Sequence, residues 1–208
     1  MPLDAALKSA WLRPVLHALC LLPLCGLAWA SLNDGLGANP IEKLTQETGE
    51  WTLRLLLVTL SLTPIRQWTG LAAVIRYRRM IGLYTFFYLC CHFTIWFVAD
   101  HSLSLSGMLE DIAKRPYITL GFSAFVLMIP LAATSSRAML LRLGKKWKTL
   151  HQLAYLILVL GVLHFIWLTR ADYLEPGIYA IIAVILLLHR IVPIKRLFAG
   201  SSPVTRQL

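Results

Sequence analysis

Six long apolar stretches dominate this chain of 208 residues and leave little sequence for anything else. Each is long enough to cross a bilayer as a helix, which takes about 20 residues. They occupy residues 11–31, 51–68, 80–99, 117–134, 150–168 and 177–194. Hydrophobic residues make up 58% of the chain and charged residues 14%, and the mean hydropathy is +0.67, so a water-soluble globule is excluded. We predict an all-α membrane protein, a six-helix transmembrane bundle that forms one domain over residues 1–208.

The net charge of +10 is distributed unevenly along the chain. With the N-terminus inside, the cytoplasmic segments carry 15 of the 20 basic residues: Lys8, Arg13, Arg66, Arg76, Arg78, Arg79, Arg137, Arg142, Lys145, Lys146, Lys148, Arg190, Lys195, Arg196 and Arg206. The opposite side carries Lys43, Arg54, Lys114, Arg115, Arg170 and every acidic residue except Asp4. Because basic loops stay in the cytoplasm, we expect both termini to lie inside. The charge then reflects membrane topology, and nucleic-acid binding is not expected.

Motifs for soluble-enzyme chemistry are absent from the sequence. It contains no GxGxxG, Walker A, HExxH or GxSxG pattern, so dinucleotide, nucleotide and hydrolytic chemistry lack support. The four cysteines do not have the spacing of a zinc site, and no convincing repeat of 20–50 residues is present. Any chemistry must therefore come from residues inside the predicted spans.

Histidines are the informative residues, because an imidazole at bilayer depth is costly unless it is paired. His92 lies about 12 Å below the outer boundary of its span and His164 about 9 Å below that of another, so the two have matching depth. Two imidazoles at one level on facing helices are suited to hold a haem iron from both sides. Gly161, one turn before His164, would let a flat macrocycle approach, although helix packing explains it equally well. A proton relay is the main alternative, and it would normally include Asp or Glu, which the predicted spans lack.

His151 is a candidate ligand for a second haem, about 20 Å from His164 along the helix axis. Thirteen residues separate them, which leaves the side chains about 140° apart on an ideal helix, so a stack needs a local irregularity. The second histidine on that haem would be His17 or His189, although each of these could also be a histidine that only packs against its neighbours. His151 follows three lysines, so an interfacial imidazole that holds a phosphate or propionate is the alternative.

Several short motifs resemble those of the ferric-reductase-like transmembrane superfamily, and the resemblance covers about residues 10–198. They are residues 78–83 (RRMIGL) leading to His92, then 134–136 (TSS), 143–147 (LGKKW), Leu150-His151 and His164. Within this superfamily, the outer segment 34–40 (DGLGANP) is similar to the YedZ/MsrQ family, the haem-binding membrane subunits of periplasmic methionine sulfoxide reductase systems.

The resemblance implies haem b held by His92 and His164 between the third and fifth helices, with His151 as a further ligand candidate. It also implies a flavin, FMN, for which no residue marks a site, and a multi-pass location in the bacterial inner membrane. Larger relatives carry a second histidine on the third helix, whereas this chain has Arg78 fourteen residues before His92. That departure puts a stack of two bis-histidine haems in doubt.

The function implied is electron transfer rather than catalysis by the chain itself. The electron acceptor that the resemblance implies is a periplasmic molybdopterin catalytic subunit that repairs oxidised methionine. We expect no nicotinamide domain, so the donor would be a cytoplasmic flavin reductase or membrane quinol. Two other functions stay open: a stand-alone metalloreductase that reduces ferric iron or dioxygen, and a non-redox scaffold or transporter with structural histidines.

Overall fold

The computed structural model describes Asp4 and residues 7–100, 102–169 and 172–191, and these contain no β-strand. The helices are α2 (Leu12–Leu32), α3 (Pro40–Thr69), α4 (Arg78–Ile95), α5 (Leu105–Lys114), α6 (Pro116–Ala133), α7 (Arg137–Leu143), α8 (Lys145–Leu150), α9 (Leu153–Leu168) and α10 (Leu174–Ile191). A 3₁₀ turn, Ala72–Tyr77, precedes α4, and a π-helical turn, Trp96–Asp100, follows it. The predicted all-helical class is confirmed for the part of the chain that is described. Predictions that concern His101, Arg170, residues 192–194, Lys195, Arg196 and Arg206 lie outside it.

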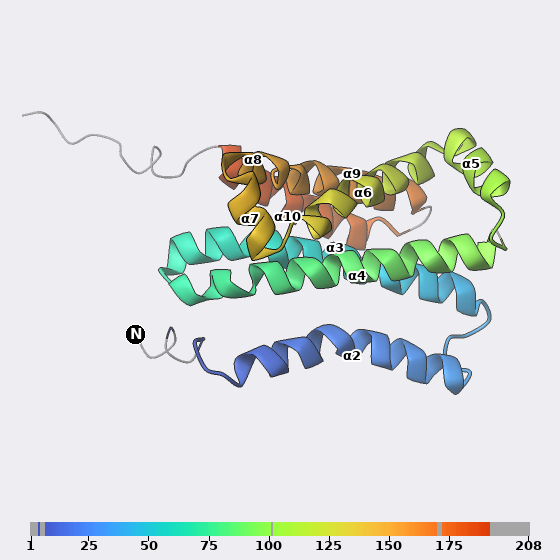
Figure 1. Ribbon diagram of the computed structural model, residues 1–208. Helices are drawn as coiled ribbons and strands as arrows, with labels where there is room; N and C mark the ends of the chain where they lie inside the picture. The colour runs from blue at the N-terminus through green and yellow to red at the C-terminus, as the bar shows by residue number, and fades with distance from the viewer. Residues whose placement is uncertain (1–3, 5–6, 101, 170–171, 192–208) are drawn as a thin grey trace, which may run out of the picture.

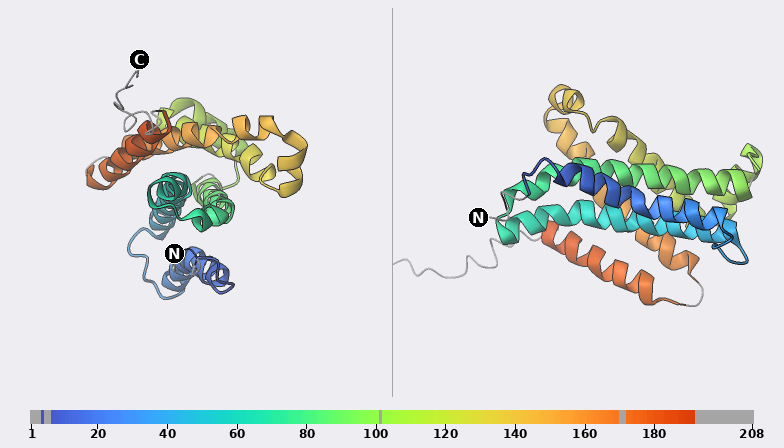
Figure 2. Two further views of the ribbon diagram at one scale, coloured as in Figure 1. Left: turned by 90° about the vertical axis from the view of Figure 1, so that its left-hand side faces the viewer. Right: turned by 90° about the horizontal axis from the view of Figure 1, so that it is seen from below.

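The long helices form three layers (Figures 1 and 2). The pair α3 and α4 lies in the middle, α2 covers one side, and α6, α9 and α10 cover the other. Buried leucines of α3 pack towards both outer layers, so α3 is the central helix of the bundle. The closest pairings are α3 with α4 and α6 with α9. Basic residues lie mainly at the end of the bundle that holds α7 and α8, which we call the basic end; the acidic end holds α5.

Five helical segments are long and apolar enough to cross a membrane: Leu12–Leu32, Ala72–Asp100, Pro116–Ala133, Lys145–Leu168 and Leu174–Ile191. They correspond to five of the six predicted spans. The remaining predicted span, residues 51–68, lies within α3, which carries Arg54 and Arg66 and is less apolar. That residues 51–68 cross the membrane, and that both termini lie in the cytoplasm, stay predictions.

Helix α3 begins eleven residues earlier than the predicted span, at Pro40. Asn39 caps it, because its side chain accepts a hydrogen bond from the backbone N–H of Glu42, and Pro40 is suited to the first turn. Lys43 and Glu47, 2.9 Å apart, pair one turn further on. This polar extension has no apolar signal, and only its capping residues could have revealed it.

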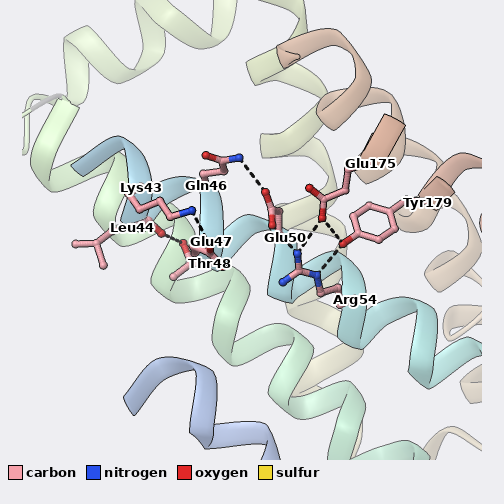
Figure 3. Close-up of polar contacts among 9 residues, drawn as sticks. All are labelled: Lys43, Leu44, Gln46, Glu47, Thr48, Glu50, Arg54, Glu175 and Tyr179. Carbon is pink, nitrogen blue, oxygen red and sulfur yellow. Dashed lines mark hydrogen bonds and ion pairs between the residues drawn. The ribbon is translucent and has the colours of Figure 1, made fainter. Parts of the chain in front are cut away.

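The early start of α3 buries a carboxylate, Glu50, that the prediction had placed outside the helices. Arg54 donates to Glu50 at 2.7 Å and to Glu175 of α10 at 2.9 Å. It also donates to the Tyr179 hydroxyl at 2.7 Å (Figure 3). This network joins α3 to α10 by satisfying a charge that would otherwise be costly to bury.

Two further features were not predicted. A short amphipathic helix, α5, lies between α4 and α6. The predicted span 150–168 is divided, because α8 ends at Leu150 and α9 begins at Leu153, with a turn at His151 and Gln152. The helix is therefore not continuous between His151 and His164, so the angle of about 140° expected for an ideal helix does not apply to them.

Replacing the central cation should destabilise the bundle. We expect Arg54→Met to cost about 1–3 kcal/mol, because it leaves the buried Glu50 without its charged partner and with only the Gln46 amide as a donor. The matched control is Lys43→Met on the same helix, where both members of the ion pair are more exposed. The measurement is the apparent unfolding temperature of detergent-purified protein. An equal fall in unfolding temperature in the two variants would show that the Arg54 network stabilises the protein no more than the exposed ion pair of Lys43 and Glu47 does.

Candidate functional site

The structure brings His92 of α4 and His164 of α9 together. Their ring centroids are 6.3 Å apart and the ring planes cross at 80°. The helix α4 belongs to the middle layer and α9 to the outer layer that also holds α6 and α10, so the two rings meet between these layers. The matching depth predicted from the sequence therefore corresponds to direct proximity.

Each of these imidazoles is held by a backbone carbonyl. The Nδ1 atom of His92 lies 2.8 Å from the carbonyl oxygen of Thr45, and that of His164 lies 2.7 Å from the oxygen of Tyr117. A carbonyl can only accept, so Nδ1 carries the proton in both rings. The Nε2 atoms take no part in hydrogen bonds among the described residues and keep their lone pairs. This arrangement is typical of histidines that bind a metal through Nε2.

A glycine lies directly behind each imidazole. A Cβ atom added at Gly49 of α3 would lie 3.0 Å from Cε1 of His92. One added at Gly121 of α6 would lie 2.9 Å from Nδ1 of His164. A Cβ atom at Gly121 would be closer to the ring than real Cβ atoms come, so the ring would have to shift. One at Gly49 would be an unusually tight contact that His92 could relieve only by moving a few tenths of an ångström. Gly161, in contrast, faces Leu53 at an ordinary contact distance of 3.6 Å, which favours the packing interpretation of that residue.

The two halves of the site repeat at a fixed offset. Thr45, Gly49 and His92 are followed 72 residues later by Tyr117, Gly121 and His164, and each triplet makes the same contacts. The repeat relates the α3–α4 pair to the α6–α9 pair. The accepting carbonyls, the glycines and the repeat were not predicted, because hardly any other residue is identical at this offset. The equal spacing of 43 residues from glycine to histidine was the available signal.

The geometry fits an iron held between the rings. With metal–nitrogen bonds of about 2 Å and ring centres about 1.2 Å beyond each nitrogen, two imidazoles on one iron place their centroids roughly 6.4 Å apart. The described residues contain no cluster of three or more His, Cys, Asp or Glu that could hold a bare metal ion. Two imidazoles suffice only if another molecule supplies the remaining ligands, as a porphyrin does. Stacked aromatic rings, Phe93 on Phe125 at 4.5 Å, form an apolar wall beside His92.

His151 shows the same pattern of hydrogen bonding at the basic end. Its Nδ1 atom lies 3.1 Å from the carbonyl oxygen of Trp147, and its ring stacks on the Trp147 indole at 3.8 Å. Its Nε2 atom is buried and has no hydrogen-bond partner among the described residues. This imidazole is therefore oriented, with its second nitrogen free.

A cavity of about 500 Å³, which we call the inner cavity, lies beside His151. Its wall contains the buried hydroxyl of Thr59, which also lacks a partner. Among the described residues, none that lines it is acidic, whereas five are basic: Arg78, Arg79, Arg137, Lys148 and Arg190. Many lining residues are related by the 72-residue offset, including Leu56 and Met128, Thr63 and Ser135, and Arg79 and His151. The inner cavity therefore lies between the same two helix pairs as the facing histidines.

The other candidate histidines lie elsewhere. His17 of α2 contacts the Tyr84 hydroxyl at 2.8 Å and does not line the inner cavity. The layer formed by α3 and α4 separates α2 from α8 and α9, so the structure does not bring His17 and His151 together (Figure 2). His189 lines a neighbouring cavity instead.

Filling the space behind one imidazole should displace it. We expect Gly121→Ala to move the His164 ring and to cost about 1–3 kcal/mol through overpacking. Gly161→Ala on α9 is the matched control, because its new methyl group would meet only the end of a flexible leucine. The measurement is the ultraviolet-visible spectrum of the protein purified with haem, together with its unfolding temperature. An unchanged spectrum in Gly121→Ala would contradict the close fit.

Comparison with known proteins agrees with this architecture. Residues 48–162 match the family model described as the ferric reductase like transmembrane component. A relative from Ralstonia nicotianae is 51% identical over 178 residues, which is 84% of this chain and 82% of the relative. One from Herminiimonas arsenicoxydans is 48% identical over 183 residues, which is 86% of this chain and 84% of the relative. Both bear the name protein-methionine-sulfoxide reductase heme-binding subunit MsrQ. The chain therefore belongs to the MsrQ family of ferric-reductase-like transmembrane proteins.

Proposed function

We propose that this chain is the haem-binding membrane subunit of a methionine sulfoxide reductase system in a bacterial inner membrane. It would carry electrons from the cytoplasmic side to a periplasmic molybdopterin catalytic subunit. The observation that carries the proposal is the facing pair His92 and His164, each fixed by a carbonyl and backed by glycine. The names of the relatives support the haem and the reductase system.

The residues of this chain would orient the two imidazoles and surround the haem with apolar side chains. A b-type haem bound between the rings supplies reversible one-electron transfer. The carbonyls of Thr45 and Tyr117 hold both rings in the tautomer that leaves Nε2 free. The stacked rings of Phe93 and Phe125 would add apolar surface next to this site. An inside-negative membrane potential would assist outward electron transfer by about 2.3 kcal/mol per 100 mV.

We infer that the inner cavity holds a second redox group near the basic end. If the group is a haem, His151 would hold its iron through Nε2, and the basic wall would hold its propionates. The counterpart of His151 in the repeat is Arg79, which favours coordination by one histidine only. FMN is the competing occupant, since the same cations would hold its phosphate. The donor, a flavin reductase or a quinol, would deliver electrons at this end.

Removing either facing imidazole should abolish the outer haem. We expect His92→Ala and His164→Ala each to lose the low-spin bis-histidine spectrum while the protein still inserts into membranes, since each variant lacks one axial ligand. His17→Ala is the matched control, because that imidazole contacts a tyrosine hydroxyl. Visible spectra of the reduced and oxidised detergent-purified proteins test this. A normal bis-histidine spectrum in either variant would refute the pairing.

Removing the third imidazole should affect only the inner group. We expect His151→Ala to lower the iron content from about two atoms to about one per polypeptide and to leave the outer low-spin spectrum intact. Iron and flavin are counted in the same preparation. Loss of flavin with unchanged iron would contradict the second haem and assign the cavity to FMN.

A further inference from the structure

A second cavity, of about 630 Å³, lies at the basic end between the last turns of α3 and α10. We call it the outer-wall cavity. Side chains with polar groups form its wall nearer the basic end: Thr63, Arg66, Gln67 and Trp68 from α3, and His189 and Arg190 from α10. Its wall nearer the middle of the bundle contains the buried side chains of Leu60 and Leu186. The cavity is therefore polar towards the basic end and apolar towards the middle of the bundle.

The charge of this cavity suits an anion. Within the described part of the chain, two guanidinium groups and no carboxylate line it. Neither Arg66 nor Arg190 forms an ion pair within the described part of the chain. The guanidinium of Arg190 lies over the Tyr155 ring, 5.7 Å from its centroid. Planar guanidinium groups bind phosphate through paired hydrogen bonds.

A buried nitrogen in the wall also lacks a partner. The Nε2 atom of His189 is buried and makes no hydrogen bond to any described residue. The Trp68 ring meets the His189 ring edge to face, with centroids 5.2 Å apart. A buried polar atom without a partner is costly, and a small rotation of the His189 ring towards the cavity would let a phosphate oxygen supply one.

The surroundings of the cavity favour a lipid over a free anion. Trp68 is 60% exposed, and tryptophan prefers the headgroup layer of a bilayer. The adjacent surface of α10 presents a continuous apolar stripe of Ile181, Ile185 and Leu188, each more than half exposed. Acyl chains would cover this stripe while the headgroup entered the polar part. Basic pockets between transmembrane helices are suited to anionic headgroups.

We propose that the outer-wall cavity binds the phosphate headgroup of an anionic phospholipid, with the acyl chains along α10. The role goes beyond electron transfer and does not depend on it. The test measures lipid binding to the full-length, detergent-purified protein by native mass spectrometry. The probes are phosphatidylglycerol and phosphatidylcholine with the same acyl chains, and inorganic phosphate as a competitor.

The binding variant is Arg66→Gln combined with Arg190→Gln. Arg190 also lines the inner cavity, whereas Arg66 lines only this one, so Arg66→Gln alone is measured beside it and should weaken binding as well. Two basic residues at about 1 kcal/mol each predict roughly thirtyfold weaker binding of phosphatidylglycerol. The matched control is Arg76→Gln combined with Arg142→Gln, which removes the same charge from exposed positions outside the cavity. Retained binding in the control supports the site. Equal weakening in both double variants, equal binding of phosphatidylcholine, or displacement by millimolar phosphate would overturn the proposal.

Discussion

An imidazole inside an apolar helical bundle has two nitrogen atoms to satisfy, and the structure satisfies only one in each of three histidines. His92, His164 and His151 each use Nδ1 to bond a backbone carbonyl. That bond fixes the tautomer and leaves the lone pair of Nε2 unused. For His92 and His164, an iron atom is the partner of Nε2 that fits the separation of the two rings.

The rest of the bundle follows from holding these rings in place. The backbones of α3 and α6 come close to the imidazoles because glycines stand at the points of contact. The repeated arrangement places one facing histidine on each of two similar helix pairs. Arg54 then joins α10 to α3 through a charge network, so the central helix is anchored on the side away from α2.

The sequence was sufficient for the helical class and for the pair of histidines, because hydropathy and counting along a helix give the depth of a residue. It was insufficient where the structure depends on packing between distant segments. Thr45 lies in a polar extension of α3 that carries no apolar signal, so its contact with His92 could not be anticipated. The burial of Glu50 was missed for the same reason. His17 and His151 both lie in predicted spans near the cytoplasmic side, and only the order of the layers shows that they lie apart.

The orientation of the two rings gives the central claim its most direct test. Ferric haem with two imidazoles in nearly perpendicular planes gives a strongly anisotropic low-spin electron paramagnetic resonance signal, whereas parallel planes give a rhombic one. The ring planes of His92 and His164 cross at 80°, so the membrane-bound protein should show the anisotropic signal. A high-spin signal, or no haem signal after expression with ample haem, would contradict an iron held between these two histidines.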